Sequence, residues 1–173
     1  MTSAELLVDA VGRIREIVHR VVDGLMPEQL AFRLDPEANS IAWLVWHLTR
    51  IQDDHLADAF QAEQVWTAGG WMERFGLPFD PQDTGYGHQA EDVAAVQVDS
   101  GALLVGYYDT VHQQTLGYVG QLTDADLGRV VDRAWDPPVT LGVRLVSVLA
   151  DDLQHAGQAA LIRGILQRRK EAS

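Results

Sequence analysis

Four long stretches of this chain repeat apolar residues every three or four positions. They cover residues 3–23, 40–61, 100–122 and 140–169. This spacing places apolar side chains on one face of an α-helix and leaves polar ones on the other. Four such helices bury their apolar faces most simply against one another, so the sequence predicts an all-α four-helix bundle.

Two connections between the predicted helices are irregular. Residues 63–90 are rich in glycine and also contain tryptophan and proline. A loop of that length in a compact domain is usually functional or partly helical, and we expect it to cover one end of the bundle. Residues 128–139 form a shorter connection, preceded by a short helical turn at 124–127. The chain is therefore interpreted as one domain, residues 1–173, of four helices with one long crossover loop.

Composition excludes several classes of function. The chain has 13 Lys and Arg against 25 Asp and Glu, whereas binding to nucleic acid requires a basic patch. Cysteine is absent, which excludes disulfides, thiolate metal sites and a cysteine nucleophile. The apolar runs are too short for a membrane span, and the first residues do not resemble a signal peptide. We therefore expect a cytoplasmic protein that binds neither nucleic acid nor membrane.

A histidine in the second helix and an acid–histidine pair in the last are candidates for a metal site. Asp151 and His155 are four residues apart, so they project from one helix face. With His47 from a facing helix, two imidazoles and one carboxylate would meet at one point. Such a set leaves a coordination position open, which is typical of catalytic rather than structural sites.

Spacing alone does not establish this site. Asp151 and the neighbouring Asp152 are equally consistent with solvated side chains, and His155 with a hydrogen bond to a backbone carbonyl. The second helix is also ambiguous, because His55 lies nearer than His47 to the middle of its apolar stripe. The two histidines are roughly 12 Å apart along the axis and cannot share one ion with the last helix. By periodicity alone, His55 is the better-buried candidate.

The segments SIAWLVWHLTRIQDDH and LADDLQHAGQAALIRGIL closely resemble the DinB-like superfamily. This superfamily includes the mycothiol-dependent maleylpyruvate isomerases. The resemblance covers nearly the whole chain and implies a DinB-type bundle. In the superfamily, a histidine of the second helix and two residues four apart in the last helix bind a divalent metal, usually zinc or nickel.

Carried over to this chain, the resemblance makes His47, Asp151 and His155 the metal ligands. The mycothiol-dependent isomerases are similar in having a carboxylate at the position of Asp151. That acid is often glutamate in the family, and aspartate is one methylene shorter, so the helices must approach more closely or a water must complete the shell. The resemblance also implies a homodimer and a low-molecular-weight thiol cosubstrate, which here has to be a small molecule because the chain has no cysteine.

Further residues receive weaker roles. His55 and Gln158 are candidates for contacts with the cosubstrate, and Asp152, Asp54 and His55 are candidates for an acid or base near the metal. His19, His88 and His112 have no partner that the sequence identifies, so we expect them at the surface. The favoured function is metal-dependent transfer or addition of a mycothiol-like thiol to an electrophilic small molecule. The alternatives are a metal-dependent hydrolase and a non-catalytic metal-binding protein.

Overall fold

Four long helices form the body of the molecule, as the sequence predicts. The computed structural model describes residues 1–171. The long helices are α1 (Ser3–Val22), α3 (Ile41–Phe60), α7 (Gly101–Val119) and α8 (Leu141–Glu171). Their ends lie within three residues of the predicted ones, and the all-α bundle is confirmed. None of the helices in the described part of the chain is both long and apolar enough to span a bilayer.

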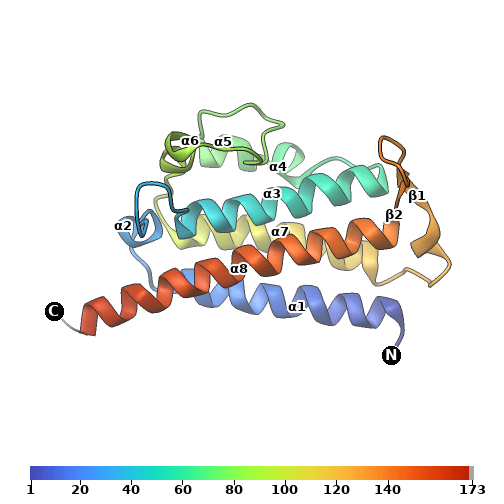
Figure 1. Ribbon diagram of the computed structural model, residues 1–173, viewed down its shortest axis with the longest axis horizontal. Coiled ribbons are helices and arrows are strands. Elements are labelled where there is room, and N and C mark those ends of the chain that lie inside the picture. The colour runs from blue at the N-terminus through green and yellow to red at the C-terminus, as the bar shows by residue number, and fades with distance from the viewer. Residues whose placement is uncertain (172–173) are drawn as a thin grey trace.

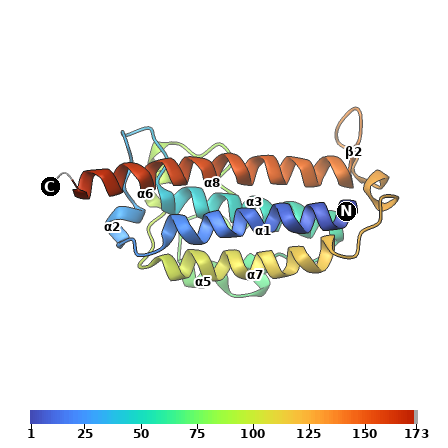
Figure 2. The same ribbon diagram turned by 90° about the horizontal axis from the view of Figure 1, so that it is seen from below.

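The helices are arranged so that α3 and α8 lie side by side and run in opposite directions (Figure 1). Helix α1 runs parallel to α8, and α7 runs parallel to α3 (Figures 1 and 2). Two successive long helices, α3 and α7, can be parallel only because the long crossover returns the chain to the end where α3 began. The antiparallel pair α3 and α8 carries the predicted metal ligands.

Local sequence explains where the helices begin. The Thr2 hydroxyl accepts from the Glu5 backbone N–H, and the Glu5 carboxylate accepts from the Thr2 backbone N–H. This capping box satisfies two of the free donors at the start of α1. At the start of α3, the Ser40 hydroxyl alone acts as the cap and accepts from the Trp43 backbone N–H. Each fully buried leucine or isoleucine of the core then contributes about 1.5–3 kcal/mol of hydrophobic free energy.

The crossover contains three short helices, α4 (Val65–Ala68), α5 (Trp71–Phe75) and α6 (Ala90–Ala95). The prediction that it covers one end of the bundle is wrong. It lies along the side of the bundle over α3, and α4 and α5 also contact α7 (Figure 1). Its apolar side chains explain this position, because Trp66, Trp71 and Phe75 are buried in the main core.

The remaining connections are short. Helix α2 (Pro27–Leu30) lies between α1 and α3. The predicted turn near residue 124 is a 3-10 helix, η1 (Asp126–Gly128), and an antiparallel hairpin of β1 (Val130–Asp132) and β2 (Val139–Thr140) follows. The sequence did not predict this hairpin, whose strands are too short to show an alternating pattern.

Candidate metal centre

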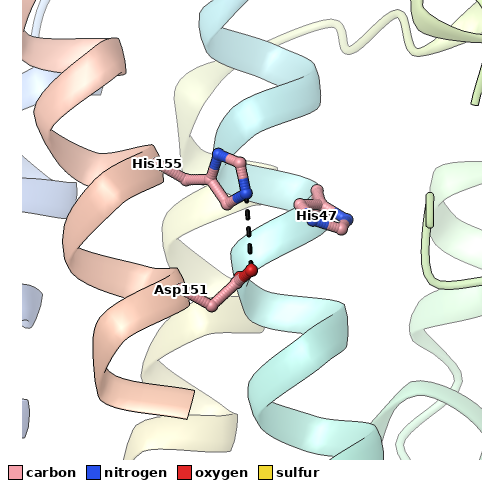
Figure 3. Close-up of side chains that lie close together, drawn as sticks. All are labelled: His47, Asp151 and His155. Atoms are coloured by element: carbon pink, nitrogen blue, oxygen red, sulfur yellow. Dashed lines mark ion pairs between the residues drawn. The ribbon is translucent and has the colours of Figure 1, made fainter. Parts of the chain in front are cut away.

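Side chains from α3 and α8 bring two imidazoles and one carboxylate together. His47 projects from α3, and Asp151 and His155 project from successive turns of α8 (Figure 3). One candidate ligand atom from each residue lies within 4.8 Å of the other two. The pairing of Asp151 with His155 follows from their helical spacing, whereas the approach of His47 follows from the packing of α3 against α8.

The crossover orients the His47 ring. Its Nδ1 lies 2.5 Å from the carbonyl oxygen of Thr84, which can only accept, so Nδ1 carries the proton. The lone pair is then on Nε2. The ring also stacks on Trp43, with centroids 4.5 Å apart. His47 is 5% exposed, so it is held in a buried position in the tautomer that a metal requires at Nε2.

The His155 ring is oriented from its own helix. Its Nδ1 lies 3.1 Å from the side-chain oxygen of Gln158, so this nitrogen also donates and Nε2 is again left as the ligand atom. Nε2 lies 3.5 Å from Oδ1 of Asp151. Gln158 therefore has a clear contact with a candidate ligand, while its predicted contact with a cosubstrate stays a prediction.

The donor set fits a divalent transition metal. Zinc–nitrogen and zinc–oxygen bonds are about 2.0–2.2 Å long, so two ligands of one ion lie at most about 4.4 Å apart. Small side-chain rotations would bring the three atoms within that limit. In the described part of the chain, the buried Oδ2 of Asp151 has no hydrogen-bond partner, as expected of an oxygen available for coordination. One carboxylate oxygen of the shorter aspartate lies within 4.8 Å of a nitrogen of each imidazole.

Buried charges of α3 hold the crossover that carries Thr84. Arg50 donates to the backbone oxygens of Asp83 and Pro81. Asp53 accepts from the backbone N–H groups of Val65 and Trp66 at the start of α4. Burial raises the pKa of Asp53, opposed by these hydrogen bonds and by one from Tyr107. Two parts of the crossover, residues 65–66 and residues 81–83, are therefore hydrogen-bonded to the helix that bears His47.

A groove of about 470 Å³ lies beside the triad. Ile51 lies one turn after His47, Ser147 lies one turn before Asp151, and both line the groove together with Thr84. The same groove is lined by Tyr86 and Trp135, which are 91% and 67% exposed. Neither this groove nor a larger hollow of about 930 Å³ between the start of α1 and the end of α7 is lined by a candidate ligand itself. The smaller groove is the better candidate for a substrate site because its lining includes the helical neighbours of His47 and Asp151.

The three candidate acids and bases have different surroundings. Asp152 is fully buried on the other side of α8 and does not approach the groove. Burial and the neighbouring Asp151 raise its pKa well above the ordinary value, which favours its neutral form. Asp54 accepts a hydrogen bond from Gln64. Of the three, His55 lines the groove.

The structure corrects the prediction about which histidine of α3 is better buried. Every residue from Ile41 to Asp53 is buried, whereas the His55 side chain is 33% exposed. A single buried stripe is the wrong description of this helix, because α7 and α8 cover one side and the crossover covers the other. His55 lies beyond the covered part.

Two further histidines were wrongly expected at the surface. His88 is almost fully buried in the crossover, where Nδ1 accepts from the indole of Trp43 and Nε2 lies 3.0 Å from Asp83. His112 is buried between helices. His19 is partly exposed, but it has a partner, Asp109. The contacts of His88 with Trp43 and of His19 with Asp109 are formed with distant elements, which sequence neighbours do not reveal.

The pKa values of the two candidate histidine ligands predict how metal affinity depends on pH. Burial lowers the pKa of His47 against the opposing hydrogen bond to Thr84. Burial also lowers the pKa of His155, but hydrogen bonds with Asp151 and Gln158 outweigh this effect, and the net result is a raised pKa. Metal binds only neutral imidazole. As pH falls, zinc affinity should therefore begin to drop above the ordinary histidine value of about 6.5, where His155 takes up a proton.

At lower pH a second proton, on His47, should steepen the dependence. Competition with a chelating dye, measured from about pH 8.5 to about pH 5, checks both steps. An affinity that stayed constant over this range would exclude histidine ligands.

Comparison with known proteins identifies the family of the chain. A model of the mycothiol-S-transferase family matches residues 6–168. A crystal structure described as the conserved protein of a locus from Enterococcus faecalis superposes with a TM-score of 0.87 at 29% sequence identity, covering 94% of this chain and 96% of that one. No curated protein matches the sequence. Because the family model spans almost the whole chain, this protein belongs to the mycothiol-S-transferase family, within the DinB-like superfamily.

Proposed function

We propose that this protein is a divalent-metal-dependent transferase that joins a low-molecular-weight thiol of mycothiol type to an electrophilic small molecule. The observation that carries the proposal is the convergence of His47, Asp151 and His155 beside a groove, with Nδ1 of each histidine hydrogen-bonded and Nε2 left as the candidate ligand atom. Membership of the mycothiol-S-transferase family supports the thiol. Zinc is the expected metal and nickel the alternative; a homodimer and a cytoplasmic location stay predictions.

Three protein ligands would leave one coordination position for an external molecule. A divalent cation held there would supply Lewis acidity and lower the pKa of a thiol at that position. The chain has no cysteine, so the sulfur has to come from a small molecule. When a thiol adds across a conjugated carbon–carbon double bond, a sulfur–carbon bond forms and the π bond breaks. The thiol proton ends on the other carbon of the former double bond, so no further reactant is needed.

The residues around the triad would position the reactants. Thr84 and Gln158 fix the two imidazoles through their Nδ1 atoms, which reduces the freedom lost when the ligands close on an ion. Ile51, Val139 and Val143 give the groove apolar walls that would exclude water from the reacting thiol.

Cobalt substitution tests the proposal. Addition of mycothiol to the cobalt-loaded protein should produce a sulfur-to-metal charge-transfer band, because a thiol sulfur would enter the open position. Protein sulfur occurs only in methionine, whose thioether is a weak ligand. Asp151→Asn should weaken the band, since the loss of one negative charge loosens the ion.

Bacillithiol and glutathione are the comparison thiols for the same titration. If the cobalt-loaded protein showed no spectral change with any of the three at millimolar concentration, the transferase proposal would be abandoned in favour of a metal-dependent hydrolase.

A further inference from the structure

An arginine and a histidine meet in the groove beside the triad, and neither belongs to the candidate ligand set. Arg144, in the first turn of α8, and His55, near the end of α3, both line the groove. The guanidinium Nη1 lies 2.9 Å from Nδ1 of His55. Residues 89 positions apart are thus in direct contact at the edge of the candidate substrate site.

This contact fixes the tautomer of His55. A guanidinium is always charged and only donates hydrogen bonds, so Nδ1 of His55 must accept and its single proton must be on Nε2. Burial and the charge of Arg144 both lower the pKa of His55 against opposing effects of Asp54, Asp151 and Asp58. At neutral pH the ring is therefore uncharged, with an N–H group on the nitrogen farthest from the backbone.

Arg144 is itself held in place. Its Nη2 donates to Oδ2 of Asp132 in β1 at 3.0 Å, and the side chain is only 13% exposed. The guanidinium is thus fixed between the hairpin and α3. In contrast, Nε2 of His55 has no hydrogen-bond partner within residues 1–171, although the ring lines the groove. The donor that the tautomer creates is left for a molecule in the groove.

We propose that Arg144 is a positioning residue that holds His55 as an Nε2–H donor, and that this donor binds a carbonyl oxygen of the thiol cosubstrate. This inference rests on the proposed function. If the sulfur occupies the open metal position, the rest of the thiol must extend from it, and the groove begins one helical turn from His47 and Asp151. Thiols that retain the cysteinyl carbonyl, such as mycothiol, bacillithiol and glutathione, carry that carbonyl carbon two bonds from the carbon that bears sulfur. The pair would therefore select cysteine-derived thiols over simple alkyl thiols.

The positioning half is tested by imidazole ¹⁵N NMR, which needs no metal or ligand. The wild type should show His55 with a pyridine-like Nδ1 and a pyrrole-like Nε2. In Arg144→Met the two shifts should move towards each other as the second tautomer becomes populated, whereas Arg144→Gln, which retains an N–H donor, should keep the wild-type pattern. Asp132→Asn is the control for the link to the hairpin and should also keep it. A wild-type spectrum with the proton on Nδ1 would overturn the inference.

The binding half is tested by calorimetric titration of the zinc-loaded protein with mycothiol and with 1-propanethiol, which has no oxygen. His55→Phe should weaken mycothiol binding about tenfold, the effect of one lost hydrogen bond, and leave 1-propanethiol unchanged. His55→Gln should restore mycothiol binding, because its amide supplies an N–H at a similar reach. Zinc content should be equal in all variants.

Equal mycothiol affinity in wild type and His55→Phe would overturn the binding half. If the zinc-loaded wild type bound neither thiol, the proposed function would fail, while the NMR measurement on the same sample would still decide whether Arg144 sets the tautomer of His55.

Discussion

His155→Ala is expected to abolish stoichiometric zinc binding while leaving the helical fold intact. His155 is one of three candidate ligands and lies partly exposed on α8, where its ring meets Trp43 and His47 only edge-on, so its removal should leave the helical fold intact. Loss of an outer-shell partner alone lowers metal affinity by about 10–100-fold, so loss of a ligand should lower it by at least about 100-fold. Elemental analysis of the purified, untagged protein gives the stoichiometry, and circular dichroism of the same sample reports the fold.

His47→Ala should have the same effect on zinc, with some additional loss of stability because this side chain is buried against Trp43. His55→Ala is the control, since it removes a histidine from the same helix outside the ligand set. If His55→Ala lost zinc and His47→Ala retained it, the assignment of the α3 ligand would be wrong.

Gly85→Ala should damage both the fold and the metal centre. Gly85 has φ of +89°, and an added Cβ would lie 2.9 Å from Nδ1 of His47 and 2.9 Å from the Trp46 ring. The backbone conformation alone costs an alanine about 1–2 kcal/mol, and the overpacking adds about 1–3 kcal/mol. Since the clash falls on the atom that donates to Thr84, the orientation of His47 should be lost and zinc affinity should fall about 10–100-fold.

Gly87→Ala is a matched control for this effect. Gly87 has φ of +81°, but no atom lies within 4 Å of an added Cβ. The control should therefore show the backbone cost in urea denaturation and keep wild-type zinc affinity. If the two variants bound zinc equally well, the contact of the crossover with His47 would have no role in the metal centre.

The number of long helices and their approximate ends could be predicted from the sequence, because both depend on residues that are close together in the chain. Helical periodicity and capping residues such as Ser40 act within one or two turns. The pairing of Asp151 with His155 is local for the same reason. The choice of His47 over His55 was not available from periodicity and came from the family resemblance, because α3 is covered on two sides rather than one.

The surroundings of the candidate ligands could not be predicted. Thr84 acts through its backbone carbonyl, which every residue possesses, so no side-chain pattern identifies it. Arg144 and His55 are too far apart in the chain for spacing to suggest their contact. The positions of His88 and His112 were predicted wrongly for a related reason, since distant elements bury them.

The sequence by itself determined which segments are helical, that no cysteine can serve as ligand or nucleophile, and that Asp151 and His155 share one face of α8. The tertiary structure alone decided that the crossover lies along α3, that Thr84 and Gln158 hold the Nδ1 atoms of His47 and His155, and that Arg144 contacts His55 beside the groove. The physical reason is distance along the chain. Helix formation and i to i+4 pairing depend on neighbours within a turn or two, whereas burial, ring orientation and tautomer depend on groups that only packing brings together.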